Sequence, residues 1–165
     1  MLIRDEQEGD HTAIANVTAR AFEGAAHSDQ SEPAIIERLR AANALTISLV
    51  AVEDAALVGH IAFSPVTIDG TQSKWFGLGP VSVEPAHQSS GMGSALIRKG
   101  LEQLRLQGAA GCVVLGDPAY YSRFGFERDD ALRYEGAPPE YFMRLNLTIE
   151  KTPTGRVDYA PAFTG

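Results

Sequence analysis

The sequence is poor in cysteine, in basic residues and in long apolar runs. It has one cysteine, Cys112, and so cannot form an intramolecular disulfide or a cysteine-rich zinc cluster. Cys112 lies in the apolar run of residues 111–115, which indicates a buried, inert thiol rather than a nucleophile. The four histidines show no metal-ligand spacing, so we expect no metal site.

The shortage of positive charge limits the kinds of partner that the protein is expected to bind. Lys and Arg number 14 against 21 Asp and Glu, giving a formal net charge of -7. Nucleic-acid binding needs a basic surface, so we expect no nucleic-acid partner, whereas an acidic surface tolerates a cationic amine. No stretch approaches the ~20 apolar residues of a membrane span, and the N-terminus lacks the apolar segment of a signal peptide. A cytoplasmic protein without a membrane partner is the expectation.

The 165 residues, 44% apolar and 21% charged, are typical of one globular domain, residues 1–165. Residue patterns predict helices after Asp10, from residue 31, from 92 to 107 and over 118–124. They predict strands at 1–4, 47–53, 57–67, 76–83, 111–115 and 142–149, with another beginning at Phe126. This order indicates an α/β protein (mixed α+β) with a mixed sheet and helices on both faces.

The segment from Val83 to Leu96 passes from an apolar strand through a polar loop into an amphipathic helix. Gly91 and Gly93 stand where that helix begins, so its free N–H groups are unobstructed and suited to an anion such as a pyrophosphate. The loop lacks the Gly-x-x-x-x-Gly-Lys-Ser/Thr pattern of nucleotide hydrolases. A dinucleotide fingerprint is also absent, because residues 77–80 lie inside a strand rather than at its end.

Two landmarks give this loop a family. Gln88-x-x-Gly91-x-Gly93, after a strand ending Val-x-Val-x-Pro, resembles the acetyl-CoA signature of the GCN5-related N-acetyltransferase (GNAT) superfamily. Tyr121, four residues before Gly125-Phe126, resembles the second landmark of that family. The segment of residues 155–163 is similar to the tail of a bacterial subgroup, the YhbS-like acetyltransferases.

The resemblance implies the GNAT fold, a twisted mixed sheet of about six to seven strands that is splayed in the middle. It also implies transfer of the acetyl group from acetyl-CoA, as cosubstrate, to a primary amine by direct attack in a ternary complex. The acceptor would be a small-molecule or peptide amine, contacted by residues 22–30 and by the segment around Tyr134 and Tyr141. Family members often form homodimers, and the sequence leaves open whether this protein is a homodimer.

In the family, backbone N–H groups of the loop hold the pyrophosphate, and the first splayed strand pairs with pantetheine. Many members have an asparagine contacting pantetheine where this chain has Asp117, which either replaces that contact or caps the following helix. The residues that the resemblance assigns to the cofactor are Val81, Val83, Gln88, Ser89, Ser90, Gly91, Met92, Gly93, Ser94, Asp117 and Tyr121.

For the chemistry, the resemblance makes Tyr121 the general acid that protonates the departing thiolate. The alternative is that Tyr120 and Tyr121 are both core aromatics, Tyr120 more so. The identity of the general base stays open, and the candidates are Glu84, His87, Glu53, His60 and a bound water chain. Two other functions stay open as well: a non-catalytic CoA-binding sensor or interaction module, and an unrelated α/β nucleotide binder.

Overall fold

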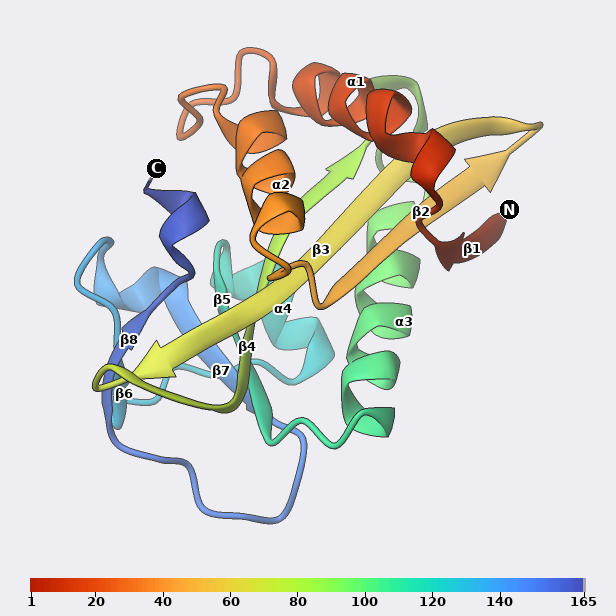
Figure 1. The fold of residues 1–165 in the computed structure, drawn as a ribbon. Helices are drawn as coiled ribbons and strands as arrows, with labels where there is room; N and C mark the ends of the chain where they lie inside the picture. The colour runs from red at the N-terminus through yellow and green to blue at the C-terminus, as the bar shows by residue number, and fades with distance from the viewer. Residues whose placement is uncertain (165) are drawn as a thin grey trace.

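The computed structural model describes residues 1–164, which form a mixed eight-stranded sheet with helices on both faces (Figure 1). Its main path runs β1-β2-β3-β4-β5-β7, and β8 pairs with β3 and β6. The strands are β1 Leu2–Asp5, β2 Ile47–Glu53, β3 Ala56–Ile68, β4 Thr71–Val83, β5 Gly111–Leu115, β6 Leu132–Arg133, β7 Phe142–Asn146 and β8 Gly155–Asp158. The helices are α1 His11–Phe22, α2 Glu32–Ala41, α3 Met92–Leu106 and α4 Pro118–Tyr121. Among residues 1–164, no helix has the length and apolar character of a membrane span.

The antiparallel meander β2-β3-β4 is set by two tight turns. Asp54 and Ala55 have φ of 50° and 63°, and Asp69 and Gly70 have φ of 50° and 75°. Positive φ at both central residues is the geometry of the two-residue hairpin turn that matches the twist of a sheet. These turns fix the register that carries β4 across the centre of the sheet toward α3.

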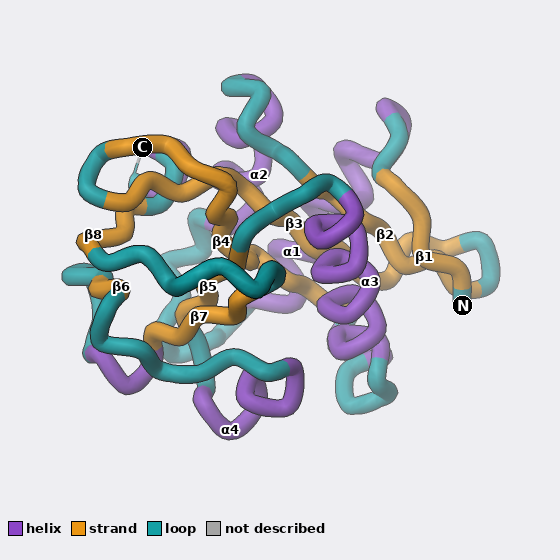
Figure 2. The backbone as a smooth tube through the Cα atoms, turned by 90° about the horizontal axis from the view of Figure 1, so that it is seen from below, coloured by secondary structure: helices purple, strands orange, loops and turns teal. Residues whose placement is uncertain are grey.

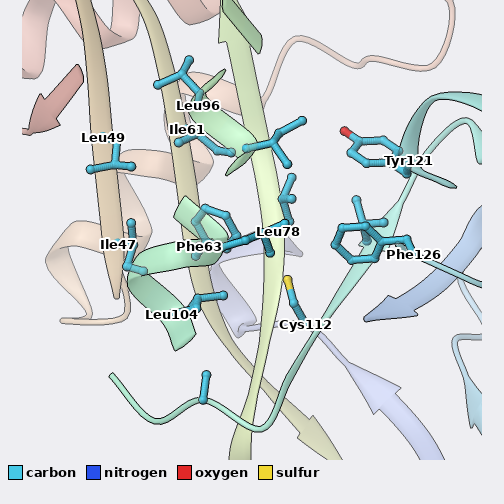
Figure 3. Close-up of a cluster of buried hydrophobic side chains, with 14 of the residues drawn as sticks. Ile47, Leu49, Ile61, Phe63, Leu78, Leu96, Leu104, Cys112, Tyr121 and Phe126 are labelled. Atoms are coloured by element: carbon cyan, nitrogen blue, oxygen red, sulfur yellow. The ribbon is translucent and has the colours of Figure 1, made fainter. Parts of the chain in front are cut away.

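Side-chain alternation along β2 separates the two helical layers. Val50 packs with Ile14 of α1 and Ile36 of α2. Its neighbours Leu49 and Ala51 point to the other face, into the large apolar cluster that contains α3 (Figure 3). The strand is therefore apolar at successive positions because both of its faces are covered.

The sheet splays between its two parallel strands. β4 and β5 pair from Trp75 opposite Gly111 to Leu78 opposite Val114, and the pairing stops there. Past that point β4 continues alongside β3 only, with a register irregularity opposite Gly79-Pro80. Gly79 has φ of 137°, which only glycine adopts readily, and Pro80 has no N–H for a ladder. The predicted splay is present, and these two residues cause it.

The C-terminal third differs from the sequence prediction. Phe126 does not begin a strand: its neighbour Glu127 makes a single bridge to Arg144, and β7 ends at Asn146. The tail forms an unpredicted strand, β8, which lies beside β6 at the end of the molecule opposite β1 (Figure 2). Strands of two to four residues are too short to produce a periodic signal.

Candidate functional site

A cleft of about 700 Å³ opens where β4 leaves β5 and α3 begins. This volume is in the range of small-molecule sites. It is bounded by the end of β4, the loop and first turn of α3, the α4 segment and the end of α1. The cleft is lined by Ala21, Phe22, Val81, Val83, His87, Gln88, Ser89, Gly91, Gly93, Ser94, Tyr120 and Arg123. Most of the residues predicted to hold the cofactor therefore lie together.

The floor of the cleft is a series of free backbone N–H groups. The first bond of α3 runs from the N–H of Ala95 to the carbonyl of Gly91, and within residues 1–164 the N–H groups of residues 89–94 have no protein acceptor. Ser89 and Gly91 have φ of 65° and 85°, which bends the backbone into a concave loop. Successive N–H groups in such a loop form an anion-binding nest, strengthened by the positive end of the helix dipole.

Arg123 supplies a full positive charge to the same cleft. Its Nη2 donates to Ser94 Oγ at 2.9 Å, and its guanidinium lies 4.9 Å from the centre of the Tyr120 ring. The sequence patterns do not predict this residue, because a lone arginine after a tyrosine pair belongs to no spacing pattern. Its position one helical turn after Tyr120, in the segment predicted to face the cofactor, was the available signal.

The β4 side of the cleft offers backbone groups, though fewer than predicted. Val81 and Val83 both line it. The carbonyl of Val83 already accepts from Gln88 Nε2 at 3.1 Å, so the Gln88 side chain anchors the loop to the strand. Val81 lies beyond the last β4–β5 pair, on the strand edge that β5 has left.

Tyr121 is buried and projects from α4 toward β4 (Figure 3). Its ring packs edge-on against Phe126 at 6.0 Å and fills the space that a side chain at Gly116 would need. Burial raises the pKa of Tyr121 to about 12, and the neighbouring Tyr120 and Cys112 raise this pKa to a lesser extent. The phenol therefore stays protonated at neutral pH. Tyr120, expected to be the more deeply packed of the two, is only partly buried and lines the cleft.

Three predicted cofactor residues direct their side chains elsewhere. Met92 is 3% exposed and packs into the core, so only its N–H faces the loop. The Ser90 hydroxyl donates to the carbonyl of His87 and closes the turn. Asp117 caps α4 by accepting from the N–H of Ala119 at 3.0 Å, which was one of its two predicted roles.

The candidate bases are dispersed. Glu84 is held by Arg20 through two contacts of 2.7 Å, and this pairing lowers the pKa of Glu84, which weakens it as a base. His60 is fully buried, bonds Ser48 at 2.8 Å and does not line the cleft. His87 lines the cleft, and its Nε2 lies 3.7 Å from a carboxylate oxygen of Glu53.

A second cavity of about 660 Å³ adjoins the first along β4. Leu78, Gly79 and Pro80 line it from β4, and Leu115 lines it from β5, so it reaches the splay. Phe22 lines both cavities. The remaining walls come from α2, from Tyr134 and from the segment after β8. Phe22 and Tyr134 belong to the two regions predicted to contact an acceptor.

Comparison with known proteins gives this arrangement a family. The model of the acetyltransferase (GNAT) domain matches residues 2–128. The N-acetyltransferase YhbS of Escherichia coli K12 is 40% identical over 169 residues, which cover 99% of this chain and 98% of YhbS. A GNAT family acetyltransferase from Brucella melitensis, solved in complex with acetyl-CoA, has a TM-score of 0.88 and 50% identity over 98% of this chain and 97% of its own.

The structure of Escherichia coli YhbS in complex with CoA superposes with a TM-score of 0.91 and 34% identity, covering 99% of this chain and 92% of that one. These findings confirm the resemblance drawn from the two motifs and exclude an unrelated α/β nucleotide binder. The chain belongs to the GNAT family of acetyltransferases and, within it, to the YhbS-like subgroup.

Proposed function

We propose that this acetyltransferase moves the acetyl group of acetyl-CoA to a primary amine, by direct attack of the amine on the thioester in a ternary complex. The observation that carries the proposal is the run of free N–H groups at residues 89–94, opening beside a splayed strand. Two GNAT relatives with nearly full-length coverage were solved with acetyl-CoA and with CoA.

The pyrophosphate would bind the N–H groups at the start of α3. Arg123, already directed into the cleft by Ser94, would neutralise part of its charge. The pantetheine arm would then run along the free edge of β4 at Val81, as an added strand does. This route leads from the nest to the splay, where the two cavities adjoin.

The reaction involves three proton movements: the ammonium loses one proton to become the nucleophile, the nitrogen loses a second as the amide forms, and the leaving thiolate gains one. The amine nitrogen forms a bond to the thioester carbon, the carbon–sulfur bond breaks, and the sulfur leaves as a thiolate. Tyr121 would give its phenolic proton to that thiolate. Burial raises the pKa of the Cys112 thiol in the same core. The same loss of hydration would make the CoA thiolate more basic, and therefore a better acceptor for the Tyr121 proton.

The second nitrogen proton would pass through water to the Tyr121 phenolate and restore the phenol. The first proton must leave the ammonium before attack. Glu53, His60, Glu84 and His87 do not line the second cavity. We therefore favour loss of this proton to water in that cavity. Within residues 1–164, no observation favours the alternative of a non-catalytic CoA-binding module.

The test is substitution of Tyr121 by Phe. Phenylalanine keeps the ring that packs against Phe126, so the substitution should leave the melting temperature unchanged. We expect turnover to fall by about 10²-fold, the lower range for a lost general acid, while the dissociation constant for acetyl-CoA stays within about twofold. Release of the CoA thiol can be followed with a thiol reagent, because Cys112 is fully buried.

Tyr120→Phe is the matched control. Tyr120 lines the cofactor cleft, and its hydroxyl lies 3.5 Å from Ser94 Oγ. This variant should raise the KM for acetyl-CoA a few-fold with little change in kcat. Equal turnover in Tyr121→Phe and wild type would reduce Tyr121 to a packing residue, and failure to bind acetyl-CoA would overturn the proposed function itself.

A further inference from the structure

Both charged residues that line the second cavity are acidic. Glu32 at the start of α2 and Asp158 at the end of β8 both line it. Within residues 1–164, no lysine, arginine or histidine lines it. A cavity lined in this way attracts a cation and repels a carboxylate.

Each carboxylate is held in place and keeps an oxygen free. Glu32 Oε1 accepts from the Ser28 hydroxyl at 2.6 Å, which orients the group. Asp158 Oδ2 is shared by Nε and Nη2 of Arg156 at 3.2 and 3.1 Å. The other oxygen of each group has no hydrogen-bond partner within the described residues and is available to an ammonium ion.

The apolar part of the lining is aromatic. Tyr159 packs edge-on against Tyr134, with ring centres 5.1 Å apart, and lies 5.4 Å from Phe163. The Tyr159 ring rests directly on β4, because Gly77 has no side chain there: a Cβ would stand 2.6 Å from its Cε1 atom. Such a wall presents flat faces and edges to a ring or to a cation.

The Tyr159 hydroxyl is an unpartnered polar group in this wall. It is inaccessible to solvent and makes no hydrogen bond within residues 1–164. The hydroxyl is closed off from the cavity as well as from bulk water, so a bound molecule would reach the ring of Tyr159 and not its hydroxyl.

Building on the proposed function, we infer that the acceptor is a small primary amine that binds as a cation and carries an aromatic ring. The ring would stack on the wall of Tyr134, Tyr159 and Phe163. The ammonium would approach Glu32 and Asp158 before it is deprotonated. An amino acid is disfavoured because its carboxylate would face the same two acids.

The sharpest comparison is phenethylamine against phenylalanine, which differ by the carboxylate, with spermidine as a cation lacking a ring. With acetyl-CoA saturating, we expect kcat/KM for phenethylamine to exceed that for either competitor by at least about tenfold. Asp158→Asn and Glu32→Gln should each raise the KM for phenethylamine about tenfold and narrow the discrimination against phenylalanine. Glutamine can still accept from Ser28, so the second variant preserves the local fold.

Two variants of the wall test stacking by calorimetry on the CoA-loaded protein. Phe163→Leu removes a ring from the wall and should weaken binding of phenethylamine several-fold while leaving binding of spermidine unchanged. Tyr159→Phe is its control, because it keeps the ring and loses only the enclosed hydroxyl, so phenethylamine binding should stay within about twofold. Preference for spermidine or phenylalanine, or no acceptance of phenethylamine by a protein that binds acetyl-CoA, would overturn this inference alone. Absence of acetyl-CoA binding would instead overturn the proposed function.

Discussion

At the scale of single residues, two adjacent tyrosines have different environments. Tyr120 is half-buried, carries the Arg123 guanidinium on its face and borders the anion site. Tyr121 is turned by the short α4 helix into the core, and its hydroxyl points toward β4 (Figure 3). A one-residue step on a helix rotates a side chain by about 100°, which explains why the Tyr120 ring borders the cleft and the Tyr121 ring enters the core.

Arg123 should contribute to cofactor binding without contributing to proton transfer. We expect Arg123→Gln to raise the dissociation constant for acetyl-CoA about tenfold, because it removes a charge-assisted contact to phosphate. The dependence of that constant on salt should weaken in the variant. Arg128→Gln is the control, since Arg128 is exposed nearby and pairs only with Asp130 among the described residues. Equal salt dependence in both variants would contradict the role of Arg123.

At the scale of elements, the site is made by the ends of β4 and α3. β4 stops pairing with β5 at Leu78, and α3 starts at Met92 with its N–H groups free. The loop between them is tied to the strand by Gln88 on the Val83 carbonyl. One irregular strand and one uncapped helix therefore produce both the anion nest and the open strand edge.

Gly93 tests this arrangement through its lack of a side chain. A Cβ there would stand 3.3 Å from the Tyr120 hydroxyl, on the side of the cleft. Because Ala favours a helix over Gly by roughly 1 kcal/mol, Gly93→Ala should keep or raise the melting temperature. The added methyl should nevertheless weaken acetyl-CoA binding several-fold in a calorimetric titration.

Gly9→Ala is the matched control, because Gly9 has open space around it and lies far from the cleft in the chain. Unchanged acetyl-CoA affinity in Gly93→Ala would show that the nest does not approach the cofactor closely. Gly91 is a poorer probe, since its φ of 85° would strain any replacement.

The elements that the sequence predicted well are those with strong local signals. β2 and β5 have the predicted bounds because each is a β-rich apolar run between turn residues. The start of α3 follows from its glycines, and the splay follows from Gly79-Pro80. By contrast, β8 and β6 form only through pairing between distant segments, which no local pattern records. For the same reason no local pattern predicts that Arg123 enters the cleft. The ion pair that weakens Glu84 as a base joins residues 64 positions apart, and it cannot be read from local sequence either.

At the scale of the whole molecule, a partly buried polar network joins the N-terminal segment, α2 and the sheet. Glu6 accepts from Arg40 at 2.9 Å and from the Ser48 hydroxyl, and Ser48 bonds His60 Nε2 at 2.8 Å. His60 is fully buried in β3, and burial lowers its pKa to about 4. The imidazole is therefore neutral in the folded protein at neutral pH, and its lowered pKa makes it a weak base that does not line the cleft.

This burial predicts an acid-sensitive fold. Below pH 6.5 the unfolded chain binds a proton at His60 that the folded chain refuses, so the unfolded state is favoured as the pH falls from 6.5 toward 4. For a pKa shift of this size, the loss at pH 4.5 is roughly 2–3 kcal/mol of unfolding free energy. Above pH 6.5 the histidine should have no such effect.

Urea unfolding of wild type and His60→Gln at pH 7 and pH 4.5 measures this contribution. Gln is uncharged at both pH values and can bond Ser48, so the variant should lose less stability between them than wild type does. The exposed His27 is the control, because His27→Gln should keep the wild-type pH dependence. If His60→Gln loses as much stability as wild type, the acid sensitivity belongs to the paired carboxylates, which lose their ion pairs as they are protonated, and not to the buried histidine.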